Sequence, residues 1–355
     1  MTNHQQQVLM MPDYRQDNPY QFLLATELQG KPHSINLNFA SGYRRVFPLF
    51  RGVKDSKATV LHLHWLTPYL KGENWLVKSV YSCKLIIDLG LVRLIGVKIV
   101  WTIHNHLSHN TQFPKLELWL RRNISQVAHQ IIVHNHSTAK YVQQAWKINP
   151  KLSIIRHGHY RDYYPPAISQ QEAKTKLNLP SDGYLYLNLG MIRPYKGIEN
   201  LLQQWQTNQT VLESHTLLIA GKPCDVAYEA QITALAMAKR AIFQPGFIPE
   251  SQMHLYFSAA DVVVLPFTNI LTSGSLILAM SYHKPIIAPR QGGIAETLFS
   301  ADDLLYHPKD NRGLANSLKA STKIDLTELS SRVEIACNRL NWDKIAQLTA
   351  ELYRN

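Results

Sequence analysis

The chain has 355 residues, 45% of them hydrophobic and 17% charged, which predicts two globular domains and excludes a disordered or fibrous protein. Three widely spaced cysteines, Cys83, Cys224 and Cys337, fit neither a disulfide framework nor a zinc site and favour a reducing cytoplasm. The net charge of +12 lies in the first half, because residues 1–165 hold 20 Lys and Arg against 8 Asp and Glu, whereas residues 166–355 hold 17 of each.

The first elements are typical of an α/β domain. Val8–Met11 has the composition of a strand, and Asn18-Pro19-Tyr20 opens a helix. The run Thr59–Trp65 predicts a second strand, with His62 and His64 on one face. His64 falls at the carboxyl end of that strand, where open α/β sheets bind ligands. We therefore treat His64 as a candidate site residue, and Asn18 and Tyr20 as candidate contacts for an acceptor.

The next predicted strand, Lys98–Thr102, is followed by three histidines, His104, His106 and His109. A histidine at a strand end can accept a proton near neutral pH or form a hydrogen bond with a sugar hydroxyl. Two other interpretations stay open. Histidines also bind zinc, although no cysteine or carboxylate cluster completes such a site here, and any one of them can be a buried residue with satisfied hydrogen bonds. His104 and His64 are favoured because they occupy equivalent strand ends.

Residues 74–95 form a long apolar segment that is compatible with a helix. Lys78, Lys84, Asp88 and Arg93 interrupt it too often for a bilayer span. The segment is either a helix packed on the sheet or an amphipathic helix that touches a membrane surface. The one-sided charge favours an anionic partner such as lipid headgroups or a phosphorylated acceptor. Nucleic acid is disfavoured, because the basic residues are dispersed and no RNA-binding or helix-turn-helix signature accompanies them.

A change of pattern marks the end of the first domain. Before it we expect helix 115–126, strand 129–133, helix 137–146 and strand 153–156. The polar segment HGHYRDYYPP then follows, so we expect an N-terminal domain of residues 1–160 and a C-terminal domain of residues 161–340, with a helix in residues 341–355 that packs back on the first domain. Crossover residues commonly line the cleft between domains, and the candidates here are His157, His159, Arg161 and Asp162.

The stretch Tyr184–Leu202, YLYLNLGMIRPYKGIENLL, predicts a strand, a turn at Gly190 and a helix that begins at Ile198. Such a junction gathers backbone N–H groups and the positive end of the helix at one place. Arg193 and Lys196 add two cations, so the combination suits a diphosphate. The alternative is an ordinary turn with two solvated basic residues.

A second helix start follows the predicted strand Asp261–Pro266. Ser273, Gly274 and Ser275 form the N-cap and first turn of an apolar helix aimed at the same edge of the sheet. They either complete an anion site with the two basic residues or only cap the helix. Glu296 lies on a later short helix, where it either accepts hydrogen bonds from ribose hydroxyls or caps that helix.

Taken in order, RPYKG before a helix, DVVVLPF, SGS before a helix, KPIIAP and GGIAE resemble the nucleotide-sugar half of GT-B glycosyltransferases. The first-half motifs VLHLHW, TIHNHLSH and RHGHYRDYYP narrow the resemblance to the β-mannosyltransferase of xanthan-type exopolysaccharide synthesis and its relatives. These motifs run from about residue 60 to residue 290 and so cover most of both domains.

The resemblance implies an α/β fold with two Rossmann-like domains facing a cleft. The implied reaction moves a sugar, with GDP-mannose as the favoured donor, to a lipid-diphosphate-linked oligosaccharide in exopolysaccharide or surface glycan synthesis. It implies that the second domain binds the nucleotide sugar, that the first binds the acceptor, and that no metal or other cofactor is required. The implied location is the cytoplasmic face of the plasma membrane, as a peripheral protein.

One departure from the family concerns the reaction course. Retaining GT-B enzymes usually carry two glutamates eight positions apart around the SGS helix, and Ile270 and Leu278 stand at those positions. The departure agrees with an inverting reaction, in which a base deprotonates the acceptor hydroxyl. His104, His64 and Asp162 are the candidate bases, and His104 is favoured because it ends a strand facing the cleft.

Two other functions stay open at this point. One is a non-catalytic module that binds a phosphorylated glycan or lipid, since both glutamates are absent. The other is a sugar-nucleotide epimerase of similar two-domain form. The retained basic pair and the SGS helix favour an intact donor site, and therefore the transferase.

Overall fold

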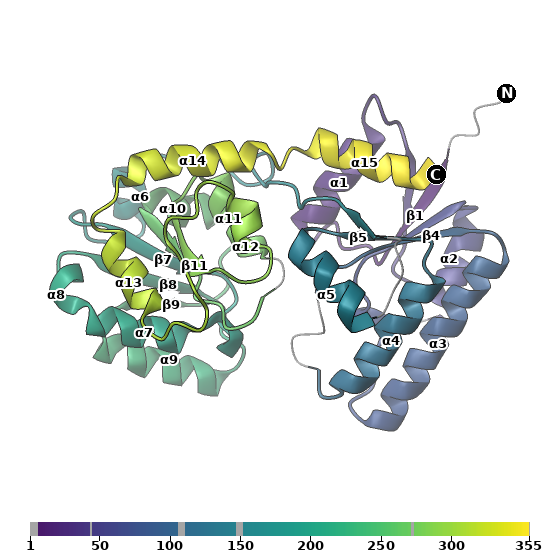
Figure 1. Cartoon of the computed structure of the whole chain (residues 1–355), viewed down its shortest axis with the longest axis horizontal. Helices are drawn as coiled ribbons and strands as arrows, with labels where there is room; N and C mark the ends of the chain where they lie inside the picture. Colours follow the sequence, from purple (N-terminus) through teal and green to yellow (C-terminus); the bar gives the residue numbers. More distant parts are fainter. Residues whose placement is uncertain (1–5, 43–44, 106–110, 147–151, 271–272, 355) are drawn as a thin grey trace. The chain divides into compact units, whose positions relative to one another are not determined.

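The structure is a computed structural model that describes residues 6–42, 45–105, 111–146, 152–270 and 273–354. The chain divides into two compact units: unit 1 comprises Met1–Gly158 with Asn341–Asn355, and unit 2 comprises His159–Leu340. Each unit contains a six-stranded parallel sheet with helices on its two faces (Figure 1). The predicted α/β class with two Rossmann-like domains is confirmed.

Unit 1 has the strand order β2-β1-β3-β4-β5-β6. Its strands are β1 (Gln7–Met11), β2 (Asn36–Phe39), β3 (Val60–Leu63), β4 (Lys98–Thr102), β5 (Gln130–Val133) and β6 (Leu152–Ile154). Its helices are α1 (Pro19–Gln29), α2 (Pro48–Ser56), the 3-10 helix η1 (Thr67–Tyr69), α3 (Trp75–Leu94), α4 (Pro114–Val127), α5 (His136–Trp146) and α15 (Trp342–Arg354).

Side chains along the strands of unit 1 alternate between two apolar layers. On β1, Leu9 and Met11 join the layer under α2, α3, α4 and α5, while Val8 and Met10 join the layer under α1 and α15. Figure 1 shows α1 and α15 side by side on their face of the sheet. The period of two that predicts a strand therefore also decides which helices each side chain contacts.

Three elements of unit 1 differ from the sequence analysis. The last strand, predicted over residues 153–156, is β6 and begins and ends earlier. The elements β2 and α2 were not predicted, because NLNF carries two asparagines and PLFRGVKDS has a glycine in its middle. The start of α2 has no hydrogen bond to a side chain of its own N-cap residue. The neighbouring helix α3 supplies the acceptor instead: the backbone N–H groups of Leu49 and Phe50 donate to the Asp88 carboxylate at 2.9 and 2.8 Å.

Unit 2 has the strand order β12-β11-β10-β7-β8-β9, in which the direction of winding reverses between β7 and β10. Its strands are β7 (Leu185–Leu189), β8 (Thr216–Gly221), β9 (Ile242–Pro245), β10 (Val262–Val264), β11 (Ile286–Pro289) and β12 (Leu305–Tyr306). Its helices are α6 (Gln170–Lys176), η2 (Pro194–Lys196), α7 (Ile198–Thr207), α8 (Gln209–Leu212), α9 (Val226–Ala238), η3 (Glu250–Gln252), α10 (Met253–Ala259), α11 (Gly274–Ser281), α12 (Ile294–Leu298), α13 (Gly313–Ala320) and α14 (Leu326–Asn338). Open sheets of this order bind ligands at the carboxyl edge of such a reversal.

Candidate functional site

The turns after β7 and β10 meet at this reversal. Gly197 has φ +70°, and a Cβ there would lie 2.0 Å from the carbonyl oxygen of Pro266, in the turn after β10. Only a glycine allows that approach. Asn188 of β7 also donates to the carbonyl oxygen of Val264 at 2.7 Å, and Thr268 donates its N–H to the carbonyl oxygen of Tyr195 at 3.0 Å. The two turns therefore form one fixed structure.

The helix that follows β10 begins inside this structure. Ser273 is the N-cap of α11, as predicted, and its side chain accepts a hydrogen bond from the N–H of Leu276 at 3.1 Å. The N–H groups of Gly274 and Ser275 belong to the first turn, so they have no acceptor within the helix. They point out of the helix start together with the positive end of its dipole.

Lys196 reaches the same point from the turn after β7. Its side chain is 9% exposed, and its Nζ donates to the Oγ of Ser275 at 3.1 Å. A Cβ on Gly190 would lie 3.6 Å from that Oγ and 4.0 Å from that Nζ, so the predicted residues Gly190, Lys196 and Ser275 are brought together. Within the part of the chain that the structure describes, no ion pair includes Lys196. A buried cation of this kind calls for an anion.

Arg193 lies close to Lys196 and strengthens that requirement. Its Nε is buried and finds no hydrogen-bond acceptor among the described residues. Burial lowers the pKa of Lys196 to about 8, and the positive charge of Arg193 contributes to the same shift. Placing two cations at the start of one helix costs free energy, because they repel each other, unless a negative group lies between or beside them. The arrangement can therefore neutralise a diphosphate.

Glu296 lies at the same edge of the sheet but on a different helix. It is half-buried in α12, which follows β11, the neighbour of β10. Its contact with ribose hydroxyls stays a prediction.

The histidines of unit 1 gather on one face of the sheet because of strand register. His64 follows β3, His104 follows β4, and His134 follows β5. By the period of two, each lies on the face of the sheet that carries Val60, Val100 and Ile132, which pack against α1 and α15. His64 Nδ1 and His104 Nε2 lie 3.2 Å apart, and His134 Nε2 and His104 Nδ1 lie 3.5 Å apart. The sequence analysis identified His64 and His104 and missed His134. His106 and His109 lie outside the described residues.

The three candidate bases differ in exposure. His104 is half-buried and stacks on Trp65, with ring centroids 4.3 Å apart, whereas His64 is 2% exposed. Burial, followed by the neighbouring histidines, lowers the pKa of His104 well below 6.5, so its imidazole is neutral at neutral pH. Asp162 is exposed in unit 2. The choice of His104 as the base stays a prediction.

Three predicted acceptor residues belong to unit 1; Tyr20 and His157 are buried, and Asn18 is half-buried. Asn18 is the N-cap of α1 and accepts the N–H of Tyr20 at 3.0 Å. Tyr20 is 2% exposed, and its ring lies 4.7 Å from the ring of His157 and 4.9 Å from that of His104, measured between centroids. His157 is 8% exposed. Asn18 therefore caps a helix, and burial disfavours an acceptor role for Tyr20 and His157. That role stays a prediction for all three residues.

The other two crossover candidates lie at the start of unit 2. Arg161 donates to Asn338 Oδ1 at 2.6 Å at the end of α14, and His159 donates its N–H to the carbonyl oxygen of Leu340 at 3.1 Å. Both contacts attach the crossover to α14 and the residues after it. Among the described residues, no group of three or more His, Cys, Asp and Glu has the arrangement of a metal site.

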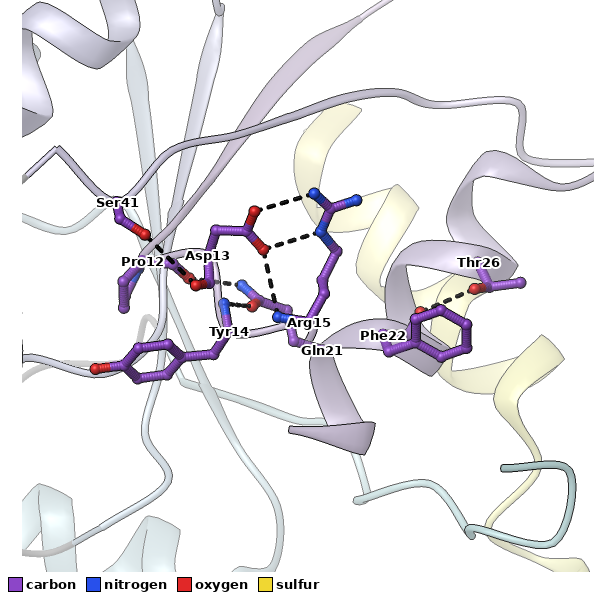
Figure 2. A network of polar contacts seen from close by, with 8 residues as sticks. All are labelled: Pro12, Asp13, Tyr14, Arg15, Gln21, Phe22, Thr26 and Ser41. Atoms are coloured by element: carbon purple, nitrogen blue, oxygen red, sulfur yellow. Dashed lines mark hydrogen bonds and ion pairs between the residues drawn. The ribbon is translucent and has the colours of Figure 1, made fainter. Parts of the chain in front are cut away.

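The loop after β1 is a feature that the sequence analysis missed. Figure 2 shows Gln21 of α1 bridging this loop: its Oε1 accepts the N–H of Tyr14 at 2.6 Å, and its Nε2 donates to Pro12 O at 2.9 Å. Asp13 pairs with Arg15, whose Nε and Nη2 lie 2.9 and 3.0 Å from the two carboxylate oxygens. This hydrogen bonding lowers the pKa of Asp13. These hydrogen bonds hold the loop after β1, the strand that pairs with β3.

Comparisons with known proteins point to one family. The model of the family "Glycosyl transferases group 1" matches residues 184–322, which span the strands and helices around Lys196 and α11. The GDP-mannose:glycolipid 4-β-D-mannosyltransferase of Xanthomonas campestris pv. campestris is 29% identical over 323 residues, covering 87% of this chain and 84% of that protein.

Two solved structures share the fold at low sequence identity. Sucrose-phosphate synthase from Thermosynechococcus elongatus has a TM-score of 0.73 with 19% identity, covering 99% of this chain and 98% of that one. HepE of Anabaena, solved in complex with UDP and glucose, has a TM-score of 0.69 with 16% identity, covering 98% and 99%.

Proposed function

We propose that this chain, a member of the group 1 glycosyltransferases of the GT-B fold, transfers mannose from GDP-mannose to a lipid-diphosphate-linked oligosaccharide with inversion. It is a nucleotide-sugar-dependent enzyme. The observation that carries the proposal is Lys196, a buried cation beside the first turn of α11. The name of the Xanthomonas relative, which specifies GDP-mannose and a glycolipid, supports this choice of donor and acceptor.

In the proposed reaction an acceptor oxygen attacks the anomeric carbon, and the bond from that carbon to the diphosphate oxygen breaks. Negative charge then builds on the departing diphosphate, where Lys196, Arg193 and the first N–H groups of α11 stabilise it. Leu278 is 8% exposed on α11, so an apolar side chain takes one of the two places where retaining relatives carry a glutamate. This supports inversion, with the acceptor proton passing to a base such as His104.

The proposed function is tested with a panel of donors. The purified chain is supplied with a short lipid-diphosphate-linked oligosaccharide and with GDP-mannose, GDP-glucose, UDP-glucose or UDP-N-acetylglucosamine, in the presence of a chelator. We expect kcat/KM for GDP-mannose to exceed that of each other donor by about tenfold or more, since a site built for particular hydroxyls rejects others strongly. A preference for a UDP-sugar, or transfer only after addition of a divalent metal, contradicts the proposal.

We further propose that α3 attaches unit 1 to a membrane surface. The part of the chain that the structure describes contains no helix with the length and hydropathy needed to span a bilayer. Yet α3 exposes a row of apolar side chains at helical spacing along its length of about 30 Å. The exposed fractions are 69% for Leu76, 66% for Val80, 53% for Ile87 and 82% for Leu94.

The same helix and its unit are also basic. Lys78, Lys84 and Arg93 are on α3, and unit 1 carries 21 Lys and Arg against 9 Asp and Glu. Apolar and basic residues together favour anionic lipid.

Vesicle binding checks this assignment. The intact chain is sedimented with vesicles of phosphatidylcholine, with or without about one-third phosphatidylglycerol. We expect preferential binding to the anionic vesicles, and about tenfold weaker partitioning for the double variant Val80→Ser and Leu94→Ser, because two apolar side chains no longer enter the lipid. The matched control replaces Val226 and Met237 of α9, which are 82% and 76% exposed, with serine. It should bind like the parent. Equal loss in both variants, or no binding by the parent, overturns the assignment.

A further inference from the structure

We infer that His134 is a positioning residue for the base: together with the carbonyl group of Ile155, it keeps the ring proton of His104 on Nδ1 and the lone pair of that ring on Nε2. The inference rests on the proposed function, because it takes His104 to be the base that accepts the proton of the acceptor hydroxyl. His134 was not among the candidates from the sequence, and its effect on His104 follows from contacts between the ends of different strands.

Three neighbouring strands of unit 1 bring these groups together at their carboxyl ends. The strand order places β4 beside β5 and β5 beside β6. Backbone hydrogen bonds continue the pairing beyond the strands, since the N–H groups of Ile103 and Ile155 both donate to carbonyl oxygens of β5, at 2.9 Å. The sheet therefore fixes His104, His134 and the carbonyl group of Ile155 relative to one another.

Aromatic packing holds the ring of His104 in one orientation. The ring stacks on Trp65, with centroids 4.3 Å apart and an interplanar angle of 13°, and the ring of Tyr20 lies against it at 4.9 Å and 81°. Its Nδ1 then lies 3.5 Å from His134 Nε2, and its Nε2 lies 3.2 Å from His64 Nδ1. Both nitrogens have a fixed neighbour, so the remaining question is which nitrogen carries the proton.

The carbonyl group of Ile155 answers that question. A carbonyl oxygen can only accept, so the His134 Nδ1 that lies 2.9 Å from it carries a proton. Burial lowers the pKa of His134 to about 4, so its ring is neutral at neutral pH and its Nε2 is an acceptor. His104 Nδ1 must then donate to that Nε2, which leaves the lone pair of the neutral His104 ring on Nε2.

The other end of the chain of rings is not anchored in this way. His64 Nδ1 donates to the lone pair of His104, while His64 Nε2 is buried and has no hydrogen-bond partner among the described residues. An unpaired buried nitrogen costs free energy, so the hydrogen bonds of the chain are complete on the side of Ile155 and incomplete on the side of His64. The direction of the chain therefore comes from Ile155 and His134.

This direction suits the proposed reaction. The O–H bond of the acceptor breaks, its proton forms a bond with His104 Nε2 in place of the His64 N–H, and the electron pair left on the oxygen attacks the anomeric carbon. The diphosphate departs with the electron pair of the bond that breaks. The His104 imidazolium keeps its Nδ1–H on His134, and the chain to the carbonyl group of Ile155 stabilises the positive charge.

Two variants of His134 separate positioning from packing. In His134→Gln the side-chain oxygen corresponds to Nε2 and can accept from His104, whereas in His134→Asn the amide nitrogen corresponds to Nδ1 and can donate to Ile155. We expect kcat for mannose transfer to fall about tenfold or more in His134→Asn, with KM for GDP-mannose unchanged, because the His104 proton is no longer kept on Nδ1. His134→Gln should recover most of that loss. His136→Gln, which changes an exposed histidine of α5, should have parental kcat.

Nitrogen NMR of protein labelled with ¹⁵N-histidine reports the tautomer of His104 directly and needs no substrate. We expect the proton on Nδ1 in the parent and in His134→Gln, and partly on Nε2 in His134→Asn; the variant His104→Gln identifies the signals. A His104 proton on Nε2 in the parent overturns the inference, whether or not any variant folds.

Two further outcomes separate this inference from the proposed function. If His134→Asn and His134→Gln lower kcat equally while the tautomer of His104 stays the same in both, His134 only packs and the positioning role is wrong. If the parent has the expected tautomer but transfers no sugar from any nucleotide donor, the proposed function is wrong and the assignment of the protons stands.

Discussion

Replacing Lys196 with alanine is expected to lower kcat by about two orders of magnitude and to weaken GDP binding. The reason is that Lys196 is a buried charge without a carboxylate partner among the described residues, so its electrostatic interaction with a developing anion is poorly screened. Turnover of GDP-mannose and calorimetric binding of GDP measure the two effects separately.

The matched control for this variant is Lys319→Ala, which removes an exposed lysine from α13 of the same unit. It should retain parental turnover. If Lys196→Ala is as active as Lys319→Ala, Lys196 does not contact the leaving group.

The pH dependence of GDP binding provides a second check on the same residue. Burial, and then the charge of Arg193, lower the pKa of Lys196 to about 8 in the free protein. The ammonium is therefore present below about pH 8 and is lost above it, so GDP affinity should fall as the pH rises through that value. In Lys196→Ala this component should be absent. An affinity that stays constant between pH 7 and pH 9 in the parent would exclude a charged Lys196 from the site.

Unit 1 is expected to unfold steeply in mild acid. Burial lowers the pKa of His62 to about 3, that of His134 to about 4 and that of His157 to about 3, all below the unfolded value of 6.5. The unfolded chain therefore binds more protons than the folded one between about pH 6 and pH 4. Each histidine then removes about 1.4 kcal/mol of stability for every pH step downward. The stability that these neutral histidines contribute is fully present above pH 6.5 and is lost as the pH falls toward their pKa values in the folded state.

Tryptophan fluorescence is suited to this measurement, because six of the seven tryptophans belong to unit 1 and only Trp205 belongs to unit 2. The free energy of unfolding is measured by urea titration at several pH values for the parent, His134→Gln and His136→Gln. His134→Gln should show a slope smaller by about 1.4 kcal/mol per pH step, whereas His136, which is exposed at the start of α5, should leave the slope unchanged. The same slope in all three proteins would contradict a buried neutral His134.

The proximity of Gly190, Lys196 and Ser275 could be predicted because its signals are local. A glycine after a strand, a basic turn and an N-cap serine are features of short sequence stretches, and the structure brings Gly190, Lys196 and Ser275 together. Contacts between distant parts of the chain could not be found in this way. Tyr160 of the crossover donates its N–H to the Oγ of Ser281 in α11, 121 residues later, and only the folded structure reveals that contact.

The histidine cluster was predictable in part. The period of two placed His62 and His64 on one face, but which strands are neighbours in a parallel sheet follows from crossovers that the sequence does not display. His134 was therefore missed, and the burial of Tyr20 and His157 was unexpected. The contacts of His62 were also missed. Its ring nitrogens form hydrogen bonds with Tyr353 Oη at 2.6 Å and Thr102 Oγ1 at 2.7 Å, which joins α15 to the sheet.

Neutralisation of a diphosphate by Lys196 and the start of α11 can be observed in a crystal structure of the chain with bound GDP. We expect phosphate oxygens within hydrogen-bond distance of Lys196 Nζ and of the N–H groups of Gly274 and Ser275. Phosphates found elsewhere on the chain, or attached to it through a magnesium ion held by carboxylates, would show that these residues do not form the diphosphate site.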